Sequence, residues 1–193
     1  MTGPITVPFG TSATKKNAVF VIIHAQATIY ENYTHVPDET KVQPHRVCFM
    51  VRRWDGKDGF PGGMVDTTDT SFVDAAIREL KEEINFPVEE GNHGLKSLIS
   101  HQISEWLTVH AFHLDLGFVP TRVLRDIVRD SVDAEHFGSE GTLMMVHLEN
   151  YKNSKGEVNN GLVNTLRASN LASAVREELI ELCRRLGIEV PAV

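Results

Sequence analysis

The sequence predicts an α/β domain in which a mixed β-sheet is sandwiched between α-helices. Two apolar runs, "NAVFVII" at 17–23 and "VCFMV" at 47–51, are rich in Val, Ile and Phe, as buried strands are. Two segments with helical spacing lie further along, at about 71–84 and 170–188. Strands interspersed with helices favour a sheet that helices cover. A chain of 193 residues has room for one such domain with a full hydrophobic core.

Each remaining element is predicted from its own local pattern. Ser71 with Asp74 resembles a capping box, which begins the first helix. Pro120 stands at a plausible helix start, and Gly187 is a stop signal for the last helix. The other predicted elements are a turn at 55–59, a short extended piece broken by glycines at 60–65, a strand at 107–116, a helix at 120–130, a strand at 141–148 and a loop at 149–161.

The composition is that of an ordinary soluble protein, with 41% hydrophobic and 23% charged residues. No apolar stretch reaches the roughly 18 residues that a membrane helix needs. Residues 1–16 lack the pattern of a secretory signal and favour a flexible tail, so that 17–193 form the domain. Cys48 and Cys183 each lie in an apolar run and indicate buried thiols. This pattern fits a reducing compartment, the cytoplasm or, in a eukaryote, the nucleus.

The net charge of −7 argues against broad nucleic-acid binding, because such binders neutralise phosphates with basic residues. Basic clusters are small, at Lys15–Lys16 and Arg52–Arg53. A phosphate-containing substrate remains compatible with this charge, since bound divalent cations can supply the missing positive charge.

The first long helix carries three carboxylates, Glu79, Glu82 and Glu83, within five residues. On a wheel of about 100° per residue its apolar residues cover roughly 140°, and Glu83 falls inside that arc. An i,i+4 ion pair between Arg78 and Glu82 explains Glu82 as a solvated residue, but it does not explain Glu83. A carboxylate that faces the core must be paired or bind a metal. We therefore expect Mg²⁺ or Mn²⁺, which prefer oxygen ligands, to neutralise this cluster.

The segment around this helix resembles the Nudix box, G-x5-E-x7-R-E-U-x-E-E-x-G-U, in which U is a bulky aliphatic residue. The matching residues are Gly63, the run Arg78–Glu83 and Phe86. Asp69 stands where the first Glu is expected, and Asn85 replaces the final Gly. The span from Asp69 to Arg78 is also one residue longer than usual.

The whole stretch "VRRWDGKDGFPGGMVDTTDTSFVDAAIRELKEEI" resembles one Nudix branch in particular, that of the small nucleolar RNA decapping enzyme, which is also a (deoxy)inosine diphosphatase. The match is strong over 47–86. It is traceable elsewhere through "SH" at 100–101 and "REELIELCRRLGI" at 176–188. The resemblance implies a Nudix fold and a homodimer.

The resemblance also implies which residues form the site. Glu82 or Glu83 would orient or deprotonate the attacking water, and Arg78 would brace the glycine turn or the carboxylates. From the residues alone, His101 would be a loop histidine and Glu181 an ordinary surface acid. The implied metal ligands are the backbone carbonyl of Gly62 and the side chains of Glu79, Glu82, Glu83, His101 and Glu181.

Four further residues match positions that hold the nucleotide. Arg53 and Phe60 agree with the branch, whereas Phe20 replaces a base-contacting histidine and Glu178 a base-contacting glutamine. Phe20 still offers a stacking face. As a carboxylate, Glu178 only accepts hydrogen bonds, which suits a base with N–H donors, such as guanine or hypoxanthine, over adenine.

The implied function is metal-dependent hydrolysis of a phosphoanhydride bond in a nucleoside di- or triphosphate, with a small-molecule nucleotide as the partner and no membrane. Two alternatives stay open. The first is a pyrophosphatase that decaps m7G-capped or NAD-capped RNA, against which the acidic net charge argues. The second is a catalytically silent Nudix fold that binds a nucleotide, against which the intact Glu79, Glu82 and Glu83 argue.

Overall fold

The computed structural model describes residues 3–12, 14–29, 34–36, 38–41, 43–88, 94–139, 141–153 and 155–192. Its main sheet has eight strands, and the longest pair, β2 and β7, is parallel while the other pairs are antiparallel. The sheet is therefore mixed, as the sequence predicts. Its strands are β1 (Ile5–Val7), β2 (Lys16–Ala27), β3 (His45–Arg53), β4 (Asp58–Gly59), β5 (Gly62–Met64), β6 (Lys96–Gln102), β7 (Leu107–Phe118) and β8 (Gly141–His147).

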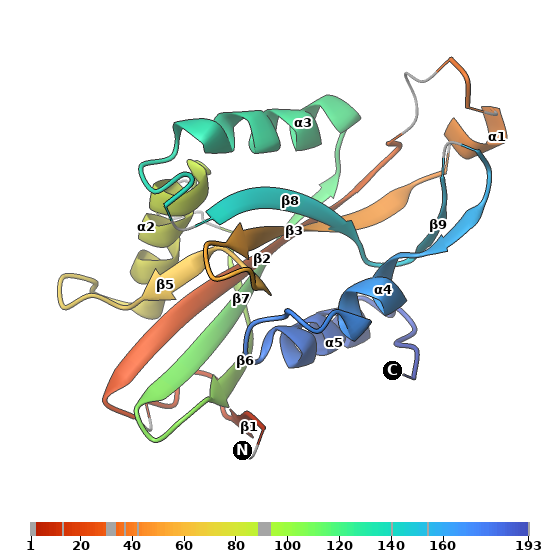
Figure 1. The fold of residues 1–193 in the computed structure, drawn as a ribbon. Helices are drawn as coiled ribbons and strands as arrows, with labels where there is room; N and C mark the ends of the chain where they lie inside the picture. Colours follow the sequence, from red (N-terminus) through yellow and green to blue (C-terminus); the bar gives the residue numbers. More distant parts are fainter. Residues whose placement is uncertain are drawn as a thin grey trace.

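Helices cover both faces of this sheet (Figure 1). Along β2, alternate residues face opposite sides, so one strand contributes to two cores. Val19, Val21 and Ile23 pack toward α2 (Phe72–Ile84) and α3 (Thr121–Asp130). Ile22 packs on the other side, where the helices are α4 (Gly161–Arg167) and α5 (Val175–Arg185). A short α1 (Asp38–Lys41) and a 3₁₀ turn at Ser131–Asp133 complete the described helices.

The predicted helix at 71–84 is α2, and its ends are set by local chemistry. The Ser71 hydroxyl accepts a hydrogen bond from the Asp74 backbone N–H at 3.1 Å, which satisfies one of the free donors at the helix start. Asn85 adopts the left-handed conformation at φ 51° and ends the helix. Asparagine tolerates this conformation better than most residues, so its replacement of the expected glycine is mild.

The last helix, expected over 170–188, is the shorter α5 at Val175–Arg185, and two further segments also differ from the sequence expectation. Residues 1–16 favour a flexible tail, but Ile5–Val7 form β1, which pairs with β6 and covers the edge of the sheet. The predicted loop at 149–161 contains a hairpin of β9 (Asn150–Lys152) and β10 (Val158–Asn160). The strands β1, β9 and β10 each have three residues, which is too short for an alternation of apolar and polar residues to reveal them in the sequence. No described helix is long and apolar enough to cross a membrane.

Candidate active site

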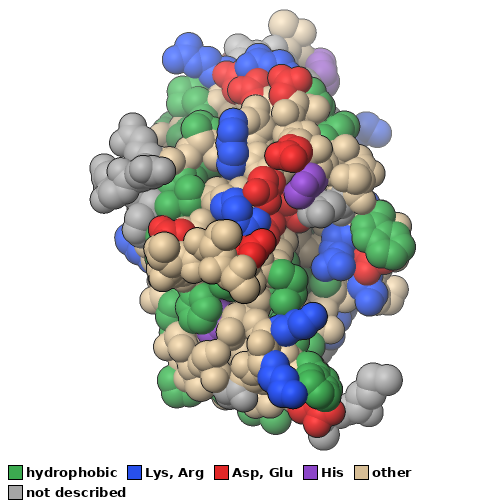
Figure 2. All heavy atoms as spheres, turned by 90° about the vertical axis from the view of Figure 1, so that its left-hand side faces the viewer, with side chains coloured by type: hydrophobic (Ala, Val, Ile, Leu, Met, Phe, Trp, Pro, Cys, Tyr) green, Lys and Arg blue, Asp and Glu red, His purple; other side chains and the backbone are tan. Residues whose placement is uncertain are grey.

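A cleft of about 920 Å³ opens between the start of β2, the turn at β5 and the carboxylate-bearing side of α2. Figure 2 shows acidic side chains gathered around a basic one near the middle of this face. The cleft brings together most of the residues that the sequence singles out. Its lining includes Phe20, Arg53, Phe60, Gly62, Arg78, Glu79, Glu82 and Glu83, together with Lys15, Lys16, Trp54 and His136.

The glycine turn lies directly against both β2 and α2. Gly62 has φ 142°, and a Cβ there would come within 2.1 Å of the Val19 carbonyl oxygen. A Cβ on Gly63 would lie 2.7 Å from both carboxylate oxygens of Glu79. Only glycine fits at position 62, where a side chain would strike the backbone of β2, whereas a side chain at position 63 would have to displace the Glu79 carboxylate.

Arg78 binds the acidic cluster from its centre. Its guanidinium donates to both oxygens of Asp69 at 3.1 and 3.0 Å, to Glu79 at 2.9 Å and to Glu82 at 2.8 Å. It also donates to the Met64 carbonyl oxygen at 3.0 Å, so it holds the end of β5 against α2. Hydrogen bonds from Arg78 lower the pKa of Asp69. Asp69, which stands in the place of the first Glu of the motif, therefore anchors the arginine.

Glu83 and Glu79 point toward the glycine turn rather than into open solvent. The Gly62 backbone N–H donates to Glu83 Oε2 at 2.8 Å. Glu79 is buried beside Gly63. The helical wheel places Glu83 inside the apolar arc, and the hydrogen bond from the Gly62 N–H pairs its carboxylate in that inward position.

The cluster offers the oxygen donors that Mg²⁺ and Mn²⁺ prefer. Within the described part of the chain, however, no three His, Cys, Asp or Glu side chains are already arranged around a common point. The reason is visible in the contacts: Arg78 Nη1 lies between Glu79 and Glu82, and Glu83 is bound to the Gly62 N–H. An ion could be held here by Glu79, Glu82 and Glu83 once these carboxylates turn from their present donors.

A second cavity of about 210 Å³ adjoins the cleft on the α5 side. It is lined by all four residues expected to hold the nucleotide, Phe20, Arg53, Phe60 and Glu178. Phe20, Arg53 and Phe60 also line the first cleft, so the two cavities share one wall. The carboxylates of α2 line only the larger cleft, and Glu178 lines only the smaller cavity next to it.

The start of α5 is tied to the sheet beside this second cavity. Asp58 in β4 accepts from the Asn170 side chain at 3.1 Å, and its backbone N–H donates to the Asn170 carbonyl oxygen at 2.9 Å. The Ala172 N–H donates to the Asp58 carbonyl oxygen at 2.9 Å. This connection brings the first turn of α5, and with it Glu178, to the cavity.

Glu178 is only 1% exposed. Burial, with a smaller contribution from Glu177, raises its pKa to about 8. At neutral pH the side chain is therefore mostly an uncharged acid that can donate as well as accept. The expectation of an acceptor-only carboxylate needs correction, because it took no account of burial.

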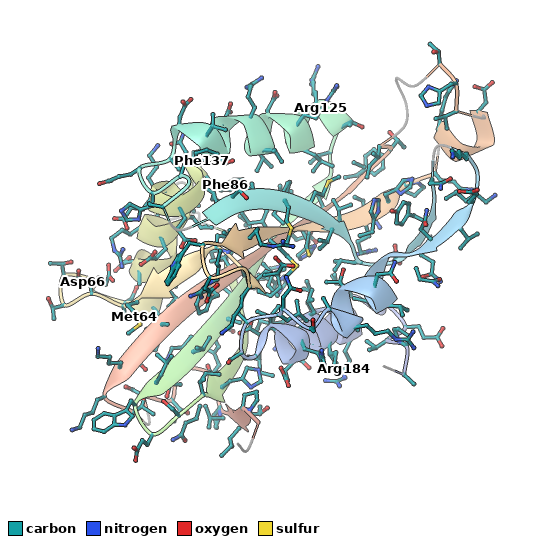
Figure 3. All side chains as sticks on the ribbon, in the orientation of Figure 1. Met64, Asp66, Phe86, Arg125, Phe137 and Arg184 are labelled. Carbon is teal, nitrogen blue, oxygen red and sulfur yellow. The ribbon has the colours of Figure 1, made fainter. Side chains whose placement is uncertain are left out.

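The structure does not bring His101 and Glu181 to the carboxylates. His101 is not in a loop but in β6, where it is buried, and its Nδ1 lies 3.5 Å from the Thr6 hydroxyl of β1. Glu181 binds Arg184 and Arg185 within α5, at 2.5 and 3.1 Å. Figure 3 shows Arg184 at α5, apart from Met64 and Asp66, which lie at the glycine turn. Neither His101 nor Glu181 lines the cleft.

Sequence reasoning missed His136. Its backbone N–H donates to the Glu82 carbonyl oxygen at 2.9 Å, and the residue lines the cleft. It lies in the irregular segment after α3, where no local pattern marks it.

The sequence of this chain is similar to those of known proteins. The model of the Nudt16-like family, described as U8 snoRNA-decapping enzyme-like, matches residues 18–188. The U8 snoRNA-decapping enzyme of Xenopus laevis is 39% identical over 127 residues, which cover 65% of this chain and 56% of the relative. The protein of the same name from Homalodisca vitripennis is 34% identical over 106 residues, covering 53% of this chain and 54% of the relative. The matches thus span about half the length of these relatives.

A shorter match extends to bacteria. The uncharacterized Nudix hydrolase NudL of Escherichia fergusonii is 51% identical over 64 residues, which cover 33% of each chain. Among solved structures, a mutT/nudix family protein from Listeria innocua superposes with a TM-score of 0.51 and 15% identity, over 90% of this chain and 95% of that one. At this identity the likeness shows the fold alone, and it agrees with the mixed sheet between helices.

Proposed function

The chain belongs to the Nudt16-like family of Nudix hydrolases, and from this premise we propose that it cleaves a phosphoanhydride bond of purine nucleoside di- or triphosphates with the help of Mg²⁺ or Mn²⁺. The observation that supports this most is the shared wall of the two cavities. The phosphates would lie beside the carboxylates of α2, and the base would lie in the smaller cavity between Phe20, Phe60 and Glu178. Hypoxanthine- or guanine-type bases are the proposed preference.

The residues of the cleft would have different roles in the reaction. Glu83, or Glu82 beside it, would take the proton of the attacking water. Arg78 fixes Glu79 and Glu82 in position, and Arg53 at the junction of the two cavities would bind phosphate. A divalent cation held by Glu79, Glu82 and Glu83 would supply the positive charge that neutralises the phosphate oxygens and makes water a better nucleophile.

A second candidate substrate is the 5′ end of a capped RNA. The lining of the cleft favours it, because Lys15, Lys16, Arg53 and Trp54 provide positive charge and an aromatic surface there in an otherwise acidic protein. Lys15 also lies 4.7 Å from the centroid of the Trp106 ring. This basic group of residues is small, so free nucleotides are the first choice.

The test is a substrate panel with purified protein. Nucleoside di- and triphosphates, ADP-ribose, dinucleotides and capped RNA are incubated with Mg²⁺, with Mn²⁺ or with EDTA, and products are separated by chromatography. We expect turnover only with metal, and Glu83→Gln should lower kcat at least about 100-fold, as expected for loss of a general base. Asp126→Asn, an exposed change on α3, is the matched control and should act like the parent.

Turnover that persists in EDTA, or that Glu83→Gln leaves unchanged, contradicts the proposed site. Turnover of capped RNA alone would favour the second candidate. The homodimer implied by the family resemblance is part of the same proposal, and size-exclusion chromatography with light scattering tests it.

A further inference from the structure

The side chain of Glu178, in the wall of the smaller cavity, contains a buried oxygen atom that lacks a hydrogen-bond partner within the described part of the chain. Its Oε1 is buried and has no hydrogen-bond partner among the described residues. The surroundings of the cavity include the rings of Phe20 and Phe60 and the side chains of Val109 and Ala172. A buried polar atom without a partner destabilises the free protein unless a ligand or a water meets it. The atom therefore indicates a place where a ligand makes a polar contact.

The chemical state of this group decides which ligand atom it can meet. The Glu178 side chain is almost completely buried, and burial disfavours the ionised form of an acid, so the neutral acid prevails at neutral pH. A neutral acid can donate a hydrogen bond, whereas a carboxylate can only accept one. Hypoxanthine and guanine present the acceptor O6 at the position where adenine presents the donor N6–H₂. A donor in the wall would thus favour the keto bases.

We infer that Glu178 acts as an uncharged hydrogen-bond donor to the O6 atom of a 6-keto purine, and that losing its proton shifts the cavity toward 6-amino purines. This inference rests on the proposed function, since it concerns the base of the same nucleotide. It makes Glu178 a specificity-determining residue that binds the base and takes no part in the cleavage step.

Other charged groups around the cavity act on this proton as well. Glu177, the neighbour on α5, favours the uncharged form of Glu178 by its negative charge. The cationic groups that line the cavity would favour the ionised form, and the Arg53 cation is itself paired with Asp55 at 3.5 Å. Among the described residues, the titratable or charged groups around Glu178 include Arg53 at the end of β3, Asp55 after it, Lys57 before β4, His101 in β6 and Glu177 in α5.

The experiment compares hydrolysis of IDP and ADP by the parent protein and by Glu178→Gln between pH 6.5 and 9. A glutamine amide has nearly the same shape and donates at every pH, so it is the matched control. Ionisation of the nucleotide itself, and of the catalytic carboxylates, affects both proteins alike and cancels in their ratio. With a pKa of about 8, the uncharged fraction of Glu178 falls about tenfold over this range.

We expect the KM for IDP of the parent, divided by that of Glu178→Gln, to rise about tenfold from pH 6.5 to 9 while the kcat ratio stays constant. The preference of the parent for IDP over ADP should shrink over the same range. Glu178→Leu should show a raised KM for IDP at low pH and no titration, because leucine neither donates nor ionises. Circular dichroism spectra establish that each variant is folded.

Two failures are distinguishable. If neither nucleotide is hydrolysed by the parent at any pH, the proposed function is wrong. If IDP is hydrolysed but the KM ratio of parent to Glu178→Gln does not change with pH, or if the kcat ratio changes instead, the proposed function stands and this inference is overturned.

Discussion

Replacing Arg78 by alanine removes the cation that holds the acidic cluster of the cleft together. The guanidinium donates to Asp69, Glu79 and Glu82 and to the Met64 carbonyl oxygen. The Asp69 and Glu79 side chains are only 5% and 8% exposed, so both would lose this cation while staying largely out of water. The substitution should therefore destabilise the fold as well as the site.

The size of the effect follows from burial. Breaking a buried ion pair by removing one partner costs about 3–5 kcal/mol. Arg78 itself is 29% exposed, so solvent weakens its attraction and we expect a loss of about 2–3 kcal/mol. In a domain of this size, 1 kcal/mol lowers Tm by about 2–4 °C, so Arg78→Ala should melt about 8 °C below the parent.

Thermal unfolding followed by circular dichroism in EDTA measures this loss. Arg129→Ala is the matched control, because Arg129 also binds two aspartates, Asp126 and Asp130, but its side chain is 68% exposed. The control should show no measurable change in Tm. Adding Mg²⁺ should restore part of the Tm of Arg78→Ala, since the cation would take over the carboxylates. A Tm within about 2 °C of the parent, or equal losses for both variants, refutes the reasoning.

Three further predictions concern the turn, the buried acid and the helix cap. Gly63→Ala should lower kcat more than about tenfold with little change in Tm, because the new methyl group displaces the Glu79 carboxylate. Gly62→Ala should lose folded protein, because its methyl group strikes the backbone of β2. Parallel assays of activity and Tm separate the two variants, and equal behaviour of both would count against this geometry. Glu178 has a raised pKa, so the stability that it contributes is fully present below its unfolded pKa and is lost as the pH rises through about 8. Urea unfolding should therefore find the stability of Glu178→Gln, relative to the parent, greater at pH 8.5 than at pH 5, and a difference that is independent of pH would show that Glu178 ionises normally. Ser71→Ala should cost about 1 kcal/mol of unfolding free energy in urea, as loss of a helix cap does, and a neutral result would mean that α2 does not depend on this cap.

The parts of the site that sequence could predict are those that local chemistry determines. Ser71 and Asn85 set the ends of α2, so the spacing of Glu79, Glu82 and Glu83 on one helix follows from their positions in the chain. The glycine pair could be placed beside the helix because the motif joins them in one short stretch. The i,i+4 pair of Arg78 with Glu82 follows from their spacing in sequence and is present, whereas the contacts of Arg78 with Asp69 and the Met64 carbonyl oxygen agree with the place between glycine turn and carboxylates that the family resemblance implies.

The parts that sequence could not predict depend on distant packing. Whether His101 and Glu181 approach the carboxylates depends on where β6 and α5 lie in the fold, and no local sequence pattern predicts the positions of these elements. In the sequence, Glu178 looks like an ordinary acidic residue of a helix. Its side chain is buried because α5 packs on the sheet, where the hydrogen bonds between Asp58 and Asn170 hold the start of the helix. His136 reaches the cleft from a segment without regular structure. Charge state and proximity in such cases are properties of the folded chain.

The wall between the two cavities restricts how this protein could acquire new substrates. A change at Phe20, Arg53 or Phe60 would alter the proposed place of bond cleavage together with the proposed place of base selection, so it should affect rate and preference at once. Ala172, Ser173 and Glu178 border only the smaller cavity. Divergence in nucleotide choice, natural or engineered, should therefore concentrate at the start of the last helix, where a substitution leaves the hydrolytic apparatus untouched.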